Sequence, residues 1–187
     1  LTPSGLTNIL ENYAQIIEEK NPKTGRKKRK QVFPRFHQRD VVHEVLAHVS
    51  AHGPGARYLI EHSAGSGKSN SIAWLAHQLI ALRHASGGVL PLPGGEGRGE
   101  GLPIFDSVIV VTDRRILDDQ IQKTVKQFMQ VGETVGHAEH SGDLRKFIEE
   151  GKKIIISTVQ KFPFILDELE KEANSKTFAI IIDEAHS

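Results

Sequence analysis

The sequence predicts an α/β fold with three layers, in which helices cover both faces of a mainly parallel β-sheet. Short apolar runs alternate along the chain with segments of helical periodicity, an order typical of such sheets. A glycine-rich turn stands between the first apolar run and a helix. Two acidic residues follow the last run. The apolar runs begin at Tyr58, Ser107, Ile154 and Phe178.

Composition sets limits on the class of protein. The 187 residues suffice for one domain with a sizeable core, and the net charge of +1 gives no global field that would attract nucleic acid. The absence of cysteine excludes disulfides, thiolate zinc sites and a cysteine nucleophile. No apolar run approaches the length of a membrane span, and residues 1–20 lack a signal-peptide core. We therefore expect a cytoplasmic protein without a membrane partner.

The first 32 residues are predicted to form a helix and a basic loop that lead into the domain. Apolar residues recur at helical spacing from Leu6 to Ile17, and Thr2 or Ser4 can cap this helix, with Pro3 at its first position. The helix either packs on its own domain or connects to an upstream one. The basic run at 21–31 could bind phosphates or act as a localisation signal, but a solvated loop is the favoured interpretation.

The domain itself is predicted to span residues 33–187 and to begin with a helix after Gln38. Valine and leucine side chains share one face of this helix, and Gly53-Pro54-Gly55 ends it. His48 and His52 lie one turn apart and could share a metal. No third ligand is visible, so surface histidines are the favoured interpretation.

The turn after the first apolar run has the chemistry of a phosphate-binding loop. Gly65 and Gly67 allow the backbone to turn its N–H groups toward one phosphate. Lys68 can reach the terminal phosphates, and Ser69 can place its hydroxyl on Mg²⁺. A chance glycine-rich turn is the alternative, because the full pattern has glycine where this chain has His62. The loop residues are Ser63, Ala64, Gly65, Ser66, Gly67, Lys68 and Ser69.

The last apolar run, Phe178 to Ile182, ends in two acids with complementary roles. A buried parallel strand reads as such a continuous run, and an acid at its carboxyl end faces the crevice where ligands bind. Asp183 can hold Mg²⁺, and Glu184 can take a proton from the attacking water. A solvated acidic turn is the alternative interpretation of the pair.

The remaining elements complete the alternation of strands and helices. Trp74 is expected in the core beside the helix that follows the loop, and residues 86–101 form a flexible insertion rich in glycine and proline. The expected helices cover 68–85, 116–128 and 143–149, with another beginning over 164–171. The expected middle strands cover 107–111 and 154–156.

Several of these motifs, in this order, resemble superfamily 2 helicases and translocases, over roughly residues 33–187. Three stretches resemble more narrowly the motor (R) subunit of type I restriction enzymes, and His62 suits that group as well. These stretches are Phe36-His37-Gln38, Val111 to Arg115 with Leu117 and Gln120, and Ile156 to Phe162. The resemblance implies a RecA-like P-loop NTPase domain with ATP and Mg²⁺ as cofactors.

The resemblance also implies roles for single residues. Gln38 would read adenine, because one amide both donates and accepts, and Arg35 or Phe36 would stack on the ring. For Arg114 and Arg115, solvated surface charge is the alternative to DNA binding. For Thr158 and Gln160, the alternative is capping of a helix. The residues expected to grip one DNA strand are Thr112, Arg114, Arg115, Thr158 and Gln160.

The resemblance makes this chain part of a first motor lobe. A second lobe with its arginine finger and a nuclease domain are expected outside it, so the isolated chain should be nearly inactive. Double-stranded DNA and the methyltransferase and specificity subunits of a restriction complex are the implied partners. An RNA or DNA helicase of the Asp-Glu-Ala-His type and a non-catalytic nucleotide-binding scaffold remain alternatives.

Overall fold

The computed structural model describes residues 2–20, 25–63, 65–84, 101–113, 121, 123–127, 135–138, 142–161 and 176–183. At its centre lies a four-stranded sheet in the order β4-β5-β3-β6, with every neighbouring pair parallel. The predicted α/β class with a parallel sheet is therefore confirmed. The strands are β3 (Ser107–Thr112), β4 (Val135–His137), β5 (Ile154–Thr158) and β6 (Phe178–Ile182).

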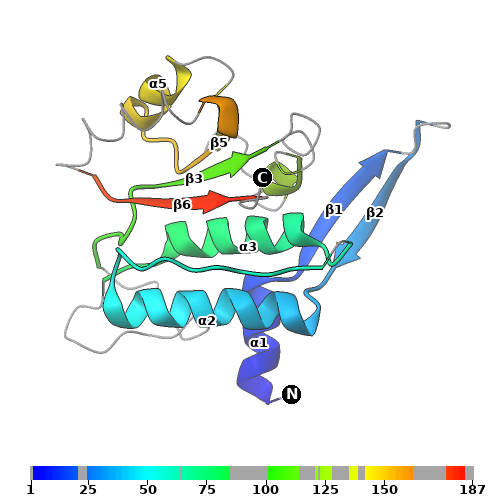
Figure 1. The fold of residues 1–187 in the computed structure, drawn as a ribbon. Coiled ribbons are helices and arrows are strands. Elements are labelled where there is room, and N and C mark those ends of the chain that lie inside the picture. Colours follow the sequence, from blue (N-terminus) through cyan, green and yellow to red (C-terminus); the bar gives the residue numbers. More distant parts are fainter. Residues whose placement is uncertain are drawn as a thin grey trace.

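Helices cover both faces of this sheet (Figure 1). The long helices α2 (Phe36–His52) and α3 (Lys68–Ala81) lie on one side, and α5 (Asp143–Glu149) lies on the other. Alternate residues of β3 serve the two layers, as the two-residue period of a strand requires. Val108 and Val110 belong to the larger apolar cluster beside α3, whereas Ile109 and Val111 join Ile148 of α5 in a second cluster.

The apolar faces predicted for the long helices are confirmed. In α2, Val42 and Leu46 are fully buried against α3, and Gly53 ends the helix with a φ of 76° that favours glycine. Trp74 of α3 is 1% exposed, as expected for a core residue. Its indole Nε1 donates a hydrogen bond to the carbonyl of Tyr13 at 2.9 Å.

The N-terminal helix α1 (Pro3–Asn12) begins as predicted, because the Thr2 hydroxyl accepts a hydrogen bond from the backbone N–H of Gly5. The predicted continuation of the helix to Ile17 is wrong. Residues Gln15–Lys20 form strand β1, which pairs antiparallel with β2 (Lys27–Val32). Residues 27–31 of the predicted basic loop are therefore part of a strand. The partly buried β-branched side chains of Ile17 and Val32 pack against the main core and hold this hairpin to the domain.

The predicted first strand, beginning at Tyr58, is also wrong. Residues 58–62 form no ladder with any described strand, although the chain runs alongside α3 (Figure 1). A strand needs a neighbour, and a cavity separates this segment from the edge of β6. Leu59 is consequently 84% exposed. Strand β4, in contrast, is present although its three residues gave no signal.

Some predicted elements lie outside the described residues. These are residues 86–100 of the insertion, the helix expected from 164, and most of the helix expected over 116–128. Of that last helix, residues 121 and 123–127 are described and are helical. Ile121 and Val125 lie in the main apolar cluster, which agrees with the predicted amphipathic pattern.

Candidate functional site

The glycine-rich loop leads directly into the amino terminus of α3. Gly65 and Gly67 adopt φ values of 72° and 87°, a region that glycine occupies without steric cost. Gly67 is the N-cap residue of α3, and no side chain caps this end of the helix. A helix amino terminus of this kind binds anions readily. Ala64, the remaining loop position, lies outside the described residues.

The side chain of Gln38 connects α2 to the glycine-rich loop. Its Nε2 donates hydrogen bonds to the carbonyls of Ser66 at 3.2 Å and Gly67 at 3.0 Å. Its Oε1 accepts one from the backbone N–H of Arg35 at 2.8 Å, which closes a capping box at the start of α2. The side chain is 2% exposed. In this structure the amide predicted to read adenine therefore joins α2 to the phosphate loop.

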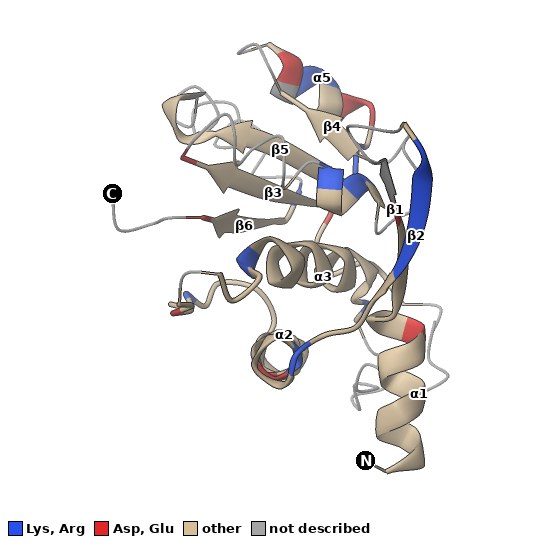
Figure 2. Ribbon diagram, turned by 90° about the vertical axis from the view of Figure 1, so that its right-hand side faces the viewer, with Lys and Arg blue, Asp and Glu red and all other residues tan. Residues whose placement is uncertain are grey.

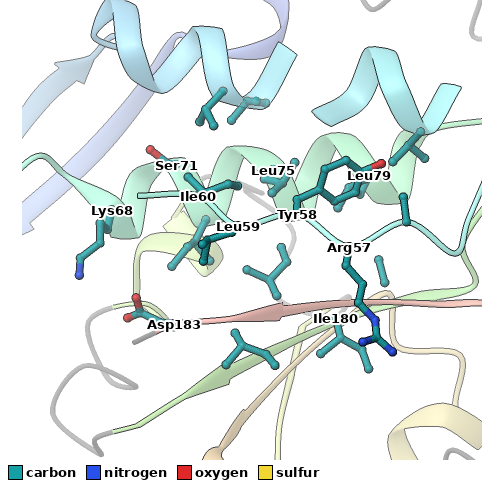
Figure 3. Close-up of a pocket in the computed structure, with 18 of the residues that line it drawn as sticks. Arg57, Tyr58, Leu59, Ile60, Lys68, Ser71, Leu75, Leu79, Ile180 and Asp183 are labelled. Carbon is teal, nitrogen blue, oxygen red and sulfur yellow. The ribbon is translucent and has the colours of Figure 1, made fainter. Parts of the chain in front are cut away.

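Lys68 and Asp183 lie at the same end of a large cavity (Figure 3). The cavity has a volume of about 1260 Å³ and extends between α3, β6 and residues 57–62. The backbone N–H of Asp183 donates to the carbonyl of Val111 at 2.8 Å, which continues the β6 ladder and fixes the acid at the carboxyl edge of the sheet. Ser63 also lines this cavity. Two segments far apart in sequence thus meet at one polar site.

The residues at this polar end fit a magnesium-bound triphosphate. Mg²⁺ is commonly held by one or two protein oxygen ligands together with phosphates and waters. Asp183, which lines the cavity, offers one such oxygen, and Ser69 in the first turn of α3 offers another. The Ser66 hydroxyl is buried in the loop and has no hydrogen-bond partner among the described residues, which leaves it available to a ligand. No cluster of three metal-binding side chains occurs in the described part of the chain. Glu184, the predicted base, lies outside it.

Two imidazoles stand beside the loop. The His37 ring lies 5.7 Å from that of His62, and His37 Nε2 lies 3.3 Å from the carbonyl oxygen of Ser66. Burial, followed by the nearby His37 and Lys68, lowers the pKa of His62. These groups favour a neutral His62 and leave Lys68 as the cation of the loop. The departure from glycine at position 62 was the only sequence signal for this arrangement.

A second cavity of about 470 Å³ lies on the α2 side of the loop. Phe36, which is 78% exposed, lines it together with His62 and Ser66. Arg35 is exposed at the start of α2. Of the two residues predicted to stack on adenine, Phe36 therefore lines a cavity beside the phosphate loop, and Arg35 precedes it in the chain.

The predicted DNA-binding threonines come together at the carboxyl edge of the sheet. Thr112 of β3 and Thr158 of β5 are direct partners in the parallel ladder. Their side chains are 0% and 4% exposed, so neither hydroxyl reaches the surface in this structure. Gln160, in the short 3₁₀ helix Val159–Lys161, is exposed. Arg114 and Arg115 lie outside the described residues.

His48 and His52 form a stacked surface pair with ring centres 4.2 Å apart. His48 Nδ1 lies 2.8 Å from the hydroxyl of Tyr58, and His52 Nδ1 lies 3.1 Å from the backbone carbonyl of His48. The described residues offer this pair no third metal ligand among His, Asp and Glu. The arrangement is that of surface histidines, as the sequence favours.

Comparison with known families supplies an independent test. The family model described as type III restriction enzyme, res subunit (ResIII) matches residues 31–187, which is most of the chain. The chain belongs to this family. It is a RecA-like P-loop domain of a helicase-like, ATP-dependent restriction subunit. The resemblance to restriction-enzyme motors is thereby confirmed at the level of helicase and restriction function.

No curated protein matches the chain. Within the described residues, no helix has the length and apolar character needed to cross a membrane.

Proposed function

We propose that this ResIII chain is the ATP-binding lobe of an ATP-dependent double-stranded DNA translocase in a type I restriction enzyme. The observation that carries the proposal is the meeting of Lys68 and Asp183 at one end of a cavity beside the helix amino terminus. The type I assignment rests on the motif stretches around Gln38, Thr112 and Thr158. Its partners would be duplex DNA and the methyltransferase and specificity subunits of the complex.

The proposed roles follow from the chemistry of each side chain. The loop from Ser63 to Gly67 would surround the phosphates with backbone N–H groups, and Lys68 would neutralise their charge. Ser69 and Asp183 would hold Mg²⁺, which supplies charge neutralisation between the phosphate oxygens. Glu184 would accept the proton of the attacking water.

Nucleotide titration of the Lys68→Ala variant tests the site directly. We expect at least a tenfold loss of affinity for a fluorescent ATP analogue with Mg²⁺, since a charge-assisted contact to phosphate contributes about 1.5–3 kcal/mol. Lys152→Ala, which removes a cation far from the loop, is the matched control. Unchanged affinity of the Lys68 variant would refute the assigned role of the loop.

The translocase part of the proposal needs the full-length parent protein. Its ATPase activity should rise with duplex DNA and be indifferent to RNA, whereas stimulation by RNA would favour a helicase of the Asp-Glu-Ala-His type. Tight nucleotide binding without any turnover in the parent would instead favour a non-catalytic scaffold. If the parent assembles without a separate specificity subunit, the type I assignment fails.

A further inference from the structure

The hairpin of β1 and β2 concentrates the positive charge of the chain. Residues 15–32 hold seven of its 24 basic residues but only two of its 23 acidic residues. The net charge of +1 therefore hides a basic hairpin on an acidic body. Figure 2 shows the positive charge running along β2, and Figure 1 shows the hairpin standing away from the helices and the sheet.

The basic side chains of β2 are directed to solvent on both faces of the hairpin. The basic side chains of β2 are all exposed, and their side alternates along the strand, as the strand period requires. Lys27 and Arg29 share the face of Glu18, and Lys28 and Lys30 occupy the other. The side chains of Lys27 and Arg29 are 71% and 80% exposed. Because these four side chains are exposed, packing against the apolar core does not account for four consecutive cations in this strand.

One carboxylate serves two of these cations. Glu18 lies 3.1 Å from Lys27 Nζ and 3.5 Å from Arg29 Nε. The hydrogen bond from Lys27, followed by Arg29, lowers the pKa of Glu18, so the acid stays ionised and still leaves the pair with a positive excess. Exposed ion pairs of this kind add little to stability. The charge is thus not needed to hold the hairpin together.

The base of the hairpin is fixed to the domain. Ile17 and Val32 pack against the main apolar cluster. Gln127 Nε2 donates to the backbone carbonyl of Glu18 at 3.1 Å, which ties β1 to the helix at 123–127. Because the base of the hairpin is fixed, a ligand bound to its charged side chains would be held in a defined position relative to the domain. A freely moving loop would not define that position.

We propose that this hairpin is a binding surface for the phosphate backbone of duplex DNA. A two-stranded ribbon is one of the elements that the major groove admits, and cations on both faces would meet the phosphates on both groove walls. Contacts of this kind fix the register of a protein on the duplex without reading sequence. The inference rests on the proposed function only in choosing duplex DNA as the polyanion.

The test measures binding of a fluorescent DNA duplex by anisotropy over a range of salt concentrations, without nucleotide. In the test variant, glutamine replaces the four cations of β2 (Lys27, Lys28, Arg29 and Lys30). In the matched control, glutamine replaces four cations of the α5 region (Arg145, Lys146, Lys152 and Lys153). Each lost phosphate contact should make the slope of log affinity against log salt shallower by about 0.9. The test variant should lose about 2 to 4, because Glu18 already neutralises part of the charge of Lys27 and Arg29 in the unsubstituted chain.

We expect the test variant to bind DNA at least tenfold more weakly than the unsubstituted chain at moderate salt. The control should bind DNA as the unsubstituted chain does. Equal losses in the two variants would overturn the proposal, because they would show an effect of net charge alone. If the unsubstituted chain bound a labelled polyglutamate peptide more strongly than the duplex, the proposal would also be overturned. Retained nucleotide affinity in the test variant separates this surface from the Lys68 site.

Glu18→Gln gives a second test in the direction of gain. Removing this carboxylate frees Lys27 and Arg29 for phosphates, so affinity for the duplex should rise several-fold and the salt slope should steepen by about 1 to 2. A residue with only a structural role would not produce tighter binding. Unchanged or weaker binding by a folded Glu18→Gln variant would contradict the proposal.

Discussion

Gly67→Ala tests the geometry of the phosphate loop more sharply than any charge substitution. Gly67 combines a φ of 87° with a close neighbour, since an added Cβ would lie 2.6 Å from Gln38 Nε2. The substitution therefore imposes a strained backbone and a collision with the side chain that holds the loop. Neither effect removes a charge or a functional group.

The expected loss follows from two contributions. A left-handed backbone conformation costs a residue with a Cβ roughly 1–2 kcal/mol. Displacing the Gln38 amide weakens its bonds to Ser66 and Gly67, each with a net value of about 1 kcal/mol. Together these terms disfavour the native loop by about 3–4 kcal/mol. Because every 1.4 kcal/mol is tenfold, nucleotide affinity should fall by about a hundredfold or more.

Gly151→Ala is the matched control for the backbone term. Gly151 has a φ of 71°, and an added Cβ would meet nothing within 4 Å. This variant should lose roughly 1–2 kcal/mol of unfolding free energy and keep its full nucleotide affinity. The comparison uses fluorescent nucleotide titration for affinity and urea unfolding for stability.

A double-mutant cycle isolates the collision. In a Gln38→Ala background the added Cβ has no amide to displace, so Gly67→Ala should cost only the backbone strain. The two substitutions should therefore show a coupling of about 2 kcal/mol in nucleotide binding. The same loss in both backgrounds, or parental affinity of the Gly67→Ala variant, would refute the reasoning.

Two further predictions concern stability. Trp74→Ala should lower the unfolding free energy by about 3–5 kcal/mol in urea titration, because the side chain is 1% exposed and its indole bonds to Tyr13; a loss under 1 kcal/mol would contradict this packing. Burial lowers the pKa of His77 in the folded state, so the unfolded chain takes up the proton first. Stability should then fall as pH drops below about 6.5, and His77→Gln should flatten this dependence of the melting temperature.

Local patterns predicted those parts of the fold that local chemistry decides. The apolar run Phe178–Ile182 is a strand within the bounds expected, and Gly53 ends α2 where the glycine-proline turn indicated. The helix predicted to continue to Ile17 is wrong because Ile16 and Ile17 fit the apolar stripe of a helix and a strand equally well. Pairing with β2 decides between the two, and that contact lies outside any local window.

The segment from Tyr58 shows a different limit. Its apolar character predicted a strand, since the sequence reports how much a segment can bury. Whether it forms a ladder depends on a neighbour within hydrogen-bonding distance. Here a cavity separates it from β6, and Ile60 and Ile180 stand 36% and 42% exposed on its two sides. The glycine-rich loop that follows this segment still leads into α3, with Gly65 and Gly67 at positive φ.

Gln38 shows why a site cannot be completed from its motifs. The sequence predicted one amide that both donates to adenine and accepts from it. In the structure both Nε2 hydrogens are directed to loop carbonyls, and Oε1 already accepts from Arg35 with one lone pair left. Donating to adenine therefore requires that a bond to Ser66 or Gly67 break. If Gln38 reads adenine as predicted, base recognition and the conformation of the phosphate loop are coupled through this one side chain.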